Sequence, residues 1–470
     1  MTTPTGSPTT FSGTGRLEFA PTNNPDDPNP TWTDITVYLR TEDTPLQITR
    51  GRQSELDVVQ PSVMTCVLDN TDGRFTYGLT TGAYGSNWAP AKKIRYSELA
   101  NGTWYVLFTG WIEYPDIASW QPIGLQYVQL SATDRLTRLA RARRFISTLS
   151  EHIILNGGAS LKAYWPLNDG NGATSPGGAS FVAGMPTLTP VTYQRNIPAP
   201  NAMDWATRTG PSGDDVSYAQ FSTRLPTPSS DTVALNCSNL SVTLSAGQTV
   251  ALIGWFYCPN DPASAATIRM LDTSFFNLAL DVSGDAASNQ WRLTGVNTPS
   301  GATGTVTIPG FPTDVWCMAG LFVDVSTGAI TGCLNGQTLT GALGGSMSGT
   351  LNIAYGYSFK GSGALGHMQL LVGDSMTVNP SLFLAQYKMG LYGLEQQTTG
   401  QRISTILDYA GVSGNDRLID PGQSYMNRAK LAGQTPGTAL ANAVGTERGR
   451  GFAGGDGRYV FHDRQRIYNV

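Results

Sequence analysis

The stretch Trp316-Cys-Met-Ala-Gly-Leu-Phe-Val-Asp324, followed by Gly332-Cys-Leu-Asn-Gly336, decides the fold of the largest part of the chain. Two apolar runs separated by a turn, the second closing on Asn-Gly, predict an antiparallel β-hairpin. Similar short runs recur over residues 161–395, with turns rich in Gly, Ser, Thr and Asn between them, and only residues 380–389 favour a helix. The pattern predicts a jelly-roll β-sandwich over 161–395.

The sequences on either side of the sandwich have a different character. Residues 16–132 contain short runs of alternating apolar and polar residues, which predict a β-barrel. Residues 396–470 combine helical patterns with a final strand and predict an α+β segment. The expected fold class is mainly β: an N-terminal β-barrel, an inserted jelly-roll sandwich and a C-terminal α+β segment. The remaining parts are a flexible N-terminus over 1–15 and a helical connector over 133–160, with a helix predicted from Asp134 to Leu149.

The composition argues against several classes of protein. The 470 residues carry a formal net charge of −4, which does not suit a nucleic-acid-binding surface. Only 14% of the residues are charged, and neutral polar faces suit permanent contacts with other subunits or with glycans. No apolar stretch reaches the ~20 residues that span a bilayer. Because the N-terminus also lacks the features of a secretion signal, we expect a protein that folds in a cytoplasm.

The five cysteines are scattered and form no Cys-x-x-Cys pair, so a zinc site is not expected. Cys66, Cys258 and Cys317 lie in apolar runs, where buried free thiols are the expected state. A Cys317–Cys333 bridge across the hairpin is the alternative.

Seven segments outside the sandwich follow one another in a recognisable order. They are Trp32–Leu39, Ile48–Arg52, Val67-Leu-Asp-Asn-Thr-Asp-Gly-Arg-Phe75 and Leu107–Glu113 before the sandwich, and Arg402–Gly411, Ala439–Gly449 and Asp456–Arg464 after it. The ordered set resembles the first β-barrel and the later segments of minor tail and baseplate hub proteins of long-tailed bacteriophages, especially those of actinobacteria. The resemblance implies a virion protein of the tail tip that is assembled in the host cytoplasm.

The sandwich region carries a second resemblance. Ala163-Tyr-Trp-Pro-Leu-Asn-Asp169, Ile253-Gly-Trp-Phe-Tyr257, the hairpin quoted above and Gly366-His-Met-Gln-Leu-Leu-Val372 follow one another along the chain. This order is similar to that of the strands in concanavalin A-like (laminin G-type) domains of phage tail proteins. Because the fold serves lectins, hydrolases and spacers alike, the resemblance implies a fold and not an activity.

Together the two resemblances imply a structural component of the tail tip or baseplate hub that displays a lectin-like domain toward host surface glycans. Members of the hub family form trimers, so a homotrimer is expected. The implied partners are the distal tail ring, the tape-measure protein and other tail-tip proteins. Two alternatives remain, a hexameric distal tail ring protein with a carbohydrate-binding module and a host adhesin.

Aromatic residues of the sandwich are candidates for stacking on sugar rings. We name Trp205, Phe276 and Tyr357 as the carbohydrate-binding candidates, and Trp120 in the N-terminal region is a further exposed aromatic. The alternative for a tryptophan in an apolar strand is the core. We expect this for Trp165, Trp255, Trp291 and Trp316.

Calcium is the only cofactor that the resemblance suggests, because related domains often bind it through acidic loop residues. Asp169 and Asp272 are the candidate ligands. Isolated aspartates in turns more often only form the turn, so the expected state is no metal.

The predicted helix over 134–149 carries a basic stripe. Arg138 and Arg141 are candidates for contacting an acidic neighbouring subunit, and a solvated helix face is the alternative.

The sequence lacks the motifs of several enzyme classes. No Glu-x-Asp-x-x-Glu pattern, which carries the two carboxylates of sandwich-fold glycoside hydrolases, lies between Leu161 and Tyr392. A Gly-x-Ser-x-Gly motif and a phosphate-binding loop are also missing. We therefore do not expect an enzyme.

Overall fold

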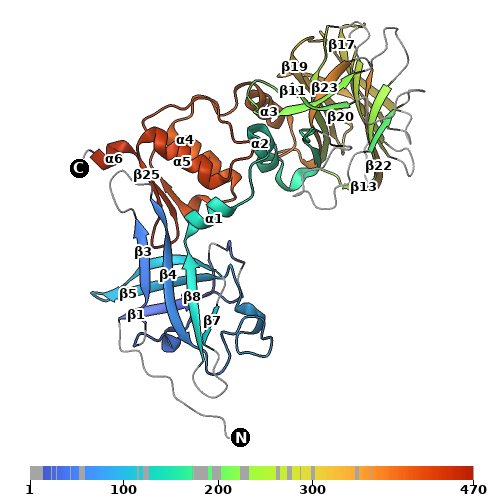
Figure 1. The fold of residues 1–470 in the computed structure, drawn as a ribbon. Helices are drawn as coiled ribbons and strands as arrows, with labels where there is room; N and C mark the ends of the chain where they lie inside the picture. Colours follow the sequence, from blue (N-terminus) through green and yellow to red (C-terminus); the bar gives the residue numbers. More distant parts are fainter. Residues whose placement is uncertain are drawn as a thin grey trace. The chain divides into compact units, whose positions relative to one another are not determined.

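A computed structural model describes residues 14–468 except 23, 28, 43, 52–58, 114–115, 120–125, 172, 174–188, 193–202, 223–231, 261–264, 273–277, 286, 298–301, 344–348 and 361. The chain forms two compact units (Figure 1). Unit 1 comprises Met1–Phe145, Gln396–Asn427 and Gly433–Val470. Unit 2 comprises Ile146–Glu395 and Arg428–Ala432, so its main part interrupts unit 1.

Unit 1 is built on an antiparallel sheet with the strand order β2-β1-β5-β6-β8-β4-β3, and β7 pairs with β8. The strands are β1 Gly15–Phe19, β2 Thr33–Asp34, β3 Gln47–Gly51, β4 Gln60–Asp69, β5 Lys93–Ala100, β6 Thr103–Ile112, β7 Asp116–Ser119 and β8 Tyr127–Thr133.

Alternation along β4 shows why these residues form strands. Met64, Cys66 and Leu68 are buried, and the residues between them are partly exposed. This period-two pattern buries one face of the sheet. An aromatic cluster completes that core, with the ring centroids of Phe75 and Trp88 4.7 Å apart.

The sheet of unit 1 is open in the described part of the chain. Its path ends at the two-residue strand β2 on one side and at β3 on the other, and no pairing joins these two edges. The expected mainly-β fold class is confirmed, but the expected closed barrel is not seen among the described strands. Ten residues of β4 and ten of β6 make long central strands. The very short β2 leaves little backbone with which to close the sheet.

The C-terminal segments add helices and a small sheet to unit 1. The helices are α1 Arg135–Arg141, α4 Thr399–Tyr409, α5 Pro436–Glu447 and α6 Arg464–Tyr468, and the strands are β24 Arg417–Ile419, β25 Arg450–Ala453 and β26 Tyr459–His462. A capping box of Thr398 and Gln401 begins α4. Helices α4 and α5 lie side by side (Figure 1). Gly437 lets α5 approach α1 closely, because a Cβ on it would lie 2.8 Å from the Ala140 Cα.

The single helix predicted over 134–149 is wrong, since two helices occupy the connector. Helix α1 ends at Arg141, and Ala142 is extended. Helix α2 begins after Ser147, whose side chain accepts a hydrogen bond from the Ser150 backbone N–H, and it spans Thr148–Gly157. The helical spacing runs across the break, but the local N-cap at Ser147 starts a new helix. Helix α1 belongs to unit 1 and α2 to unit 2.

Unit 2 is a sandwich of two antiparallel sheets. The first has the order β10-β13-β22-β15-β16-β17-β18, with bounds β10 Thr189–Thr192, β13 Thr232–Leu244, β15 Ala265–Asp272, β16 Leu278–Asp285, β17 Gln290–Asn297, β18 Ala302–Pro309 and β22 Gly349–Lys360. The second has the order β11-β12-β23-β14-β19-β20-β21, with β9 also paired to β23. Its bounds are β9 Leu161–Trp165, β11 Met203–Thr209, β12 Ser217–Ser222, β14 Gln248–Tyr257, β19 Trp316–Asp324, β20 Ala329–Leu334, β21 Gln337–Ala342 and β23 Ser362–Asp374.

The central strands β14 and β19 of the second sheet are buried on both faces. Val250, Leu252 and Phe256 point to the core shared with the first sheet. Ile253 and Trp255 of the same strand point the other way. They belong to a separate core that includes residues of α2 and of α3 Pro380–Tyr392. This explains the almost unbroken apolar run of β14, which is typical of a strand covered on both sides.

The hairpin predicted from Trp316–Asp324 and the following apolar run forms as β19 and β20. Its Asn335-Gly336 pair, however, makes the next turn, between β20 and β21, where both residues have positive φ (47° and 86°). The alternative Cys317–Cys333 bridge is wrong, because Cys333 pairs with Gly320 and both cysteines are free and buried. Cys66 and Cys258 are buried free thiols as predicted. No described helix is long and apolar enough to cross a membrane.

Candidate functional site

Three partly exposed side chains gather where β14 ends and β19 begins. Tyr257 and Trp316 are cross-strand partners, with ring centroids 6.0 Å apart and ring planes at 60°. Arg208, near the end of β11, places its guanidinium carbon 3.8 Å from the centroid of the Tyr257 ring. We call Arg208, Tyr257 and Trp316 the aromatic patch.

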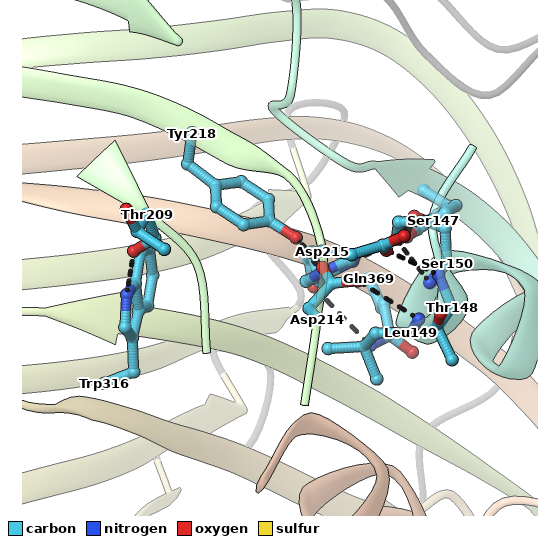
Figure 2. A network of polar contacts seen from close by, with 12 residues as sticks. Ser147, Thr148, Leu149, Ser150, Thr209, Asp214, Asp215, Tyr218, Trp316 and Gln369 are labelled. Atoms are coloured by element: carbon cyan, nitrogen blue, oxygen red, sulfur yellow. Dashed lines mark hydrogen bonds and ion pairs between the residues drawn. The ribbon is translucent and has the colours of Figure 1, made fainter. Parts of the chain in front are cut away.

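The Trp316 ring has a fixed orientation. Its Nε1–H donates a hydrogen bond of 2.8 Å to the carbonyl of Thr209 (Figure 2). Its ring also packs edge-to-face against Tyr218, with centroids 5.4 Å apart. An aromatic ring held in this way presents its remaining surface without further loss of conformational entropy when a ligand binds.

Arg208 supplies the positive charge of the patch. Among the described residues its side chain has no ion pair, and its Nε–H is shielded from solvent with no hydrogen-bond acceptor. The Asp314 carboxylate lies nearby and accepts hydrogen bonds from the Tyr257 hydroxyl at 3.4 Å and the Asn260 backbone N–H at 3.3 Å. A guanidinium group with free donors next to an aromatic ring suits a carboxylate, a phosphate or a ring of hydroxyl groups.

A buried polar network lies beneath the patch and is reached through Tyr218. The Tyr218 hydroxyl contacts both the Asp214 carboxylate and the His367 Nε2, and His367 Nε2 lies 3.0 Å from Asp214 Oδ2. On the other side of the imidazole, Nδ1 lies 2.7 Å from the Tyr164 hydroxyl, which donates to Ser150 Oγ at 2.9 Å. We call these residues, together with Ser147, the buried polar network.

The network ties three separate segments to the sheet. Asp214 accepts the backbone N–H of Leu149 at 3.3 Å, and its neighbour Asp215 accepts that of Thr148 at 3.2 Å, both at the start of α2 (Figure 2). Asp215 also accepts the backbone N–H of Ala432 at 2.8 Å. The two carboxylates thus cap α2 and hold the loop before β12 in place, as acidic groups at a helix N-terminus do.

His367 reaches the network through a local irregularity of β23. Its φ of 51° is in the left-handed region, which is uncommon for a residue other than glycine. The pairing of β23 with β14 shifts register at this position, and the His367 backbone N–H bonds instead to the Pro166 carbonyl at 3.1 Å. A β-bulge therefore directs the imidazole out of the regular pleat.

Electrostatics favour a charged Asp214. Burial alone would raise the pKa of this carboxyl group, but hydrogen bonds from His367 and two hydroxyl groups hold the pKa below its usual range. Burial and the neighbouring Asp214 carboxylate raise the pKa of Tyr218 well above its usual value. A neutral phenol therefore donates to a carboxylate.

The hydrogen bonds of the buried polar network hold neighbouring segments of unit 2 in position. Its Asp214 and His367 side chains have no solvent exposure. Ser150 bonds to Tyr164 and not to the imidazole, so serine, histidine and aspartate do not form a nucleophile relay.

The predicted carbohydrate-binding residues are not brought together. Trp205 is only 5% exposed and packs in the core between the sheets, so its prediction as a stacking platform is wrong. Phe276 and Trp120 lie outside the described residues, as does the side chain of Tyr357. Trp165, Trp255 and Trp291 are core residues as predicted, whereas Trp316 is only partly buried.

The candidate calcium ligands stay a prediction. Asp169 is partly exposed in the loop after β9, and the side chain of Asp272 lies outside the described residues. No group of three or more acidic, histidine or cysteine side chains that could hold a metal ion occurs in the part of the chain that the structure describes.

Arg138 and Arg141 form ion pairs within unit 1. Arg138 contacts Asp26 at 2.8 Å, and Arg141 contacts Glu113 at 2.6 Å. The Arg138 guanidinium also lies 4.6 Å from the centroid of the Trp111 ring. Both arginines therefore have an acidic partner within the same unit. Their role at a subunit interface stays a prediction.

Unit 2 is thus a sandwich of two antiparallel sheets. No model of a protein family matches the chain, and no curated protein does. Among solved structures, an endo-1,3-β-glucanase from Streptomyces sioyaensis is similar at 12% identity over 33% of this chain and 76% of that chain (TM-score 0.26). The carbohydrate-binding module CBM66 from Bacillus subtilis is 7% identical over 36% and 95% (0.23). The binding domain of botulinum neurotoxin serotype D is 9% identical over 53% and 55% (0.32). These similarities are too distant to indicate an activity.

Proposed function

We propose that the chain is a structural subunit of the tail tip of a long-tailed bacteriophage. Unit 1 would form part of the tail-tip hub, and unit 2 would be a sandwich displayed for contact with saccharides of the host surface.

One observation carries the tail-tip proposal. The segments that resemble successive parts of tail hub proteins lie on both sides of the sandwich in sequence, and both groups belong to the same compact unit. Arg135, from the first group, donates a hydrogen bond of 2.7 Å to the Gly457 carbonyl in the last one. A long insertion at a loop is compatible with such a framework, because the cost of closing a loop grows slowly with its length.

Immunolabelling tests the location. Antibodies against the purified chain, applied to particles of the phage that encodes it, should label the end of the tail distal to the capsid. Label on the capsid, or no label on intact particles, would contradict the proposal. The adhesin alternative predicts label on fibres that project beyond the tip.

The aromatic patch supports the saccharide contact. It combines two rings on neighbouring strands with a guanidinium group that lacks a carboxylate partner among the described residues. Aromatic faces stack on sugar rings, and a few directed polar groups fix the orientation of a ligand. We therefore place the contact at Arg208, Tyr257 and Trp316 and not at Trp205.

Binding of cell-wall saccharides by the full chain tests this placement. Arg208→Ala should weaken binding at least about tenfold, as expected for the loss of a charge-assisted hydrogen bond. Arg292→Ala, which removes an exposed arginine from β17 in the other sheet, is the matched control and should leave binding unchanged. Equal effects of the two variants would show that only net charge matters.

A further inference from the structure

Unit 1 contains an apolar cleft of ≈ 660 Å³ between α1, α5 and the small sheet. Its walls include Leu136 and Leu139 of α1, Leu440 and Val444 of α5, and Tyr459 of β26. The volume lies in the range of specific binding sites and is large enough to receive several side chains. We call this feature the apolar cleft.

The charged side chains that line the apolar cleft are all positive among the described residues. Arg448 and Arg450 are among the residues that line it, and no acidic residue is among the described lining residues. Neither arginine has an ion pair among the described residues, although most other arginines of unit 1 do. Arg448 is exposed and has a left-handed backbone (φ 57°) at the end of α5. The cleft therefore fits an apolar segment that carries a carboxylate.

The β5–β6 hairpin of the same unit has this chemistry. Three large apolar side chains are exposed at its tip: Leu99 at 37%, Trp104 at 40% and Tyr105 at 53%. Glu98, the cross-strand partner of Tyr105, is exposed and accepts a hydrogen bond of 3.3 Å from the Tyr96 hydroxyl. Within the described part of the chain Glu98 forms no ion pair. A single hairpin with so much exposed apolar surface is typical of a contact site.

We infer that the apolar cleft receives the tip of the β5–β6 hairpin from a second copy of this chain, with Glu98 of one copy next to Arg448 and Arg450 of the other. The two surfaces are different, so the contact is head-to-tail. Such a contact repeats from copy to copy and closes into a ring where the rotation allows. The ring itself rests on the proposed function, whereas the contact rests only on the two surfaces.

A charge exchange in the full chain tests the contact by mass photometry over a range of concentrations. Glu98→Arg and Arg448→Glu should each weaken self-association at least about tenfold, because each places like charges at the interface. Combined in one chain, they restore an opposite-charge pair and should recover most of the loss. Glu42→Arg, a reversal at an exposed site of unit 1, is the control and should change nothing. Circular dichroism checks that each variant folds.

Mixing Tyr105→Cys chains with Ala441→Cys chains tests the same contact independently. A disulfide-linked dimer that forms only in the mixture is expected. If the chain self-associates but neither charge reversal weakens it, or if the combined variant is not rescued, the inferred contact is wrong and the tail-tip proposal stands. If the chain stays monomeric at every concentration, the contact is also overturned, and the composition of the phage particle then decides the proposed function separately.

Discussion

At the scale of single residues, Asp214 is a buried carboxylate that links several segments of unit 2. Its carboxylate bonds to His367 and Tyr218 inside the sandwich and to the start of α2. We expect Asp214→Asn to lower the free energy of unfolding by about 2 kcal/mol at pH 7, since hydrogen bonds to charged groups contribute about 1.5–3 kcal/mol. Urea denaturation at pH 7 measures the loss. The exposed Asp204→Asn of β11 is the control and should have little effect.

The effect of Asp214 also has a defined pH dependence. Because its folded-state pKa is depressed, the stabilisation is fully present above the unfolded value of about 3.9 and is lost as the pH falls through the folded-state pKa. The difference between the native protein and Asp214→Asn should therefore shrink below about pH 4. A difference that stays constant down to pH 2.5 would show that Asp214 acts only through packing.

The burial of a single residue can be predicted where the local sequence pattern determines it. Trp165 and Trp255 lie in short, almost unbroken apolar runs, so their burial follows from a strand that is covered on both faces. The aromatic patch could not be predicted, because Arg208, Tyr257 and Trp316 come from three strands whose proximity depends on the order of the sheet. One feature of the sequence indicates that Trp316 is partly exposed: it is the first residue of an apolar run.

At the scale of elements, the close approach of α1 and α5 gives a prediction with an internal control. Gly437→Ala should destabilise unit 1 by about 1–3 kcal/mol, because the new Cβ would press on the Ala140 backbone. Gly445→Ala in the same helix meets open space and should stabilise it by up to about 1 kcal/mol through helix propensity. Thermal unfolding of the two variants measures both. If both variants unfolded at a higher temperature than the native protein, α1 and α5 would not be in close contact.

The type of each helix or strand could be predicted from the sequence more reliably than the residues at which it begins and ends. The strands β14 and β19 follow from composition, and the capping pattern of Thr435-Pro436 marks the start of α5. The break between α1 and α2 does not follow from the apolar spacing over 134–149, which continues through it. The helix is interrupted by the extended backbone at Ala142 and begins again at the N-cap Ser147. The bulge at His367 was also missed, since a positive φ at histidine has no simple sequence signal.

At the scale of the whole molecule, the interruption of unit 1 by unit 2 is the feature on which the tail-tip proposal rests. The segments before and after the sandwich share unit 1, where Arg135 also forms an ion pair with Asp416 at 3.4 Å. A module that folds on both sides of an insertion can take its place in a ring while the insertion keeps its own core. The mainly-β class was predictable at this scale, whereas the open sheet of unit 1 was not, because strand closure depends on pairings that sequence spacing does not specify.

The number of copies of this chain in a phage particle tests the central claim most directly. Quantitative mass spectrometry of purified particles, calibrated on the major capsid protein, gives this number. A tail-tip hub predicts three copies per particle, in keeping with the trimers of the family that the framework resembles. Six copies would favour the distal tail ring, and absence of the chain from the particles would contradict the account.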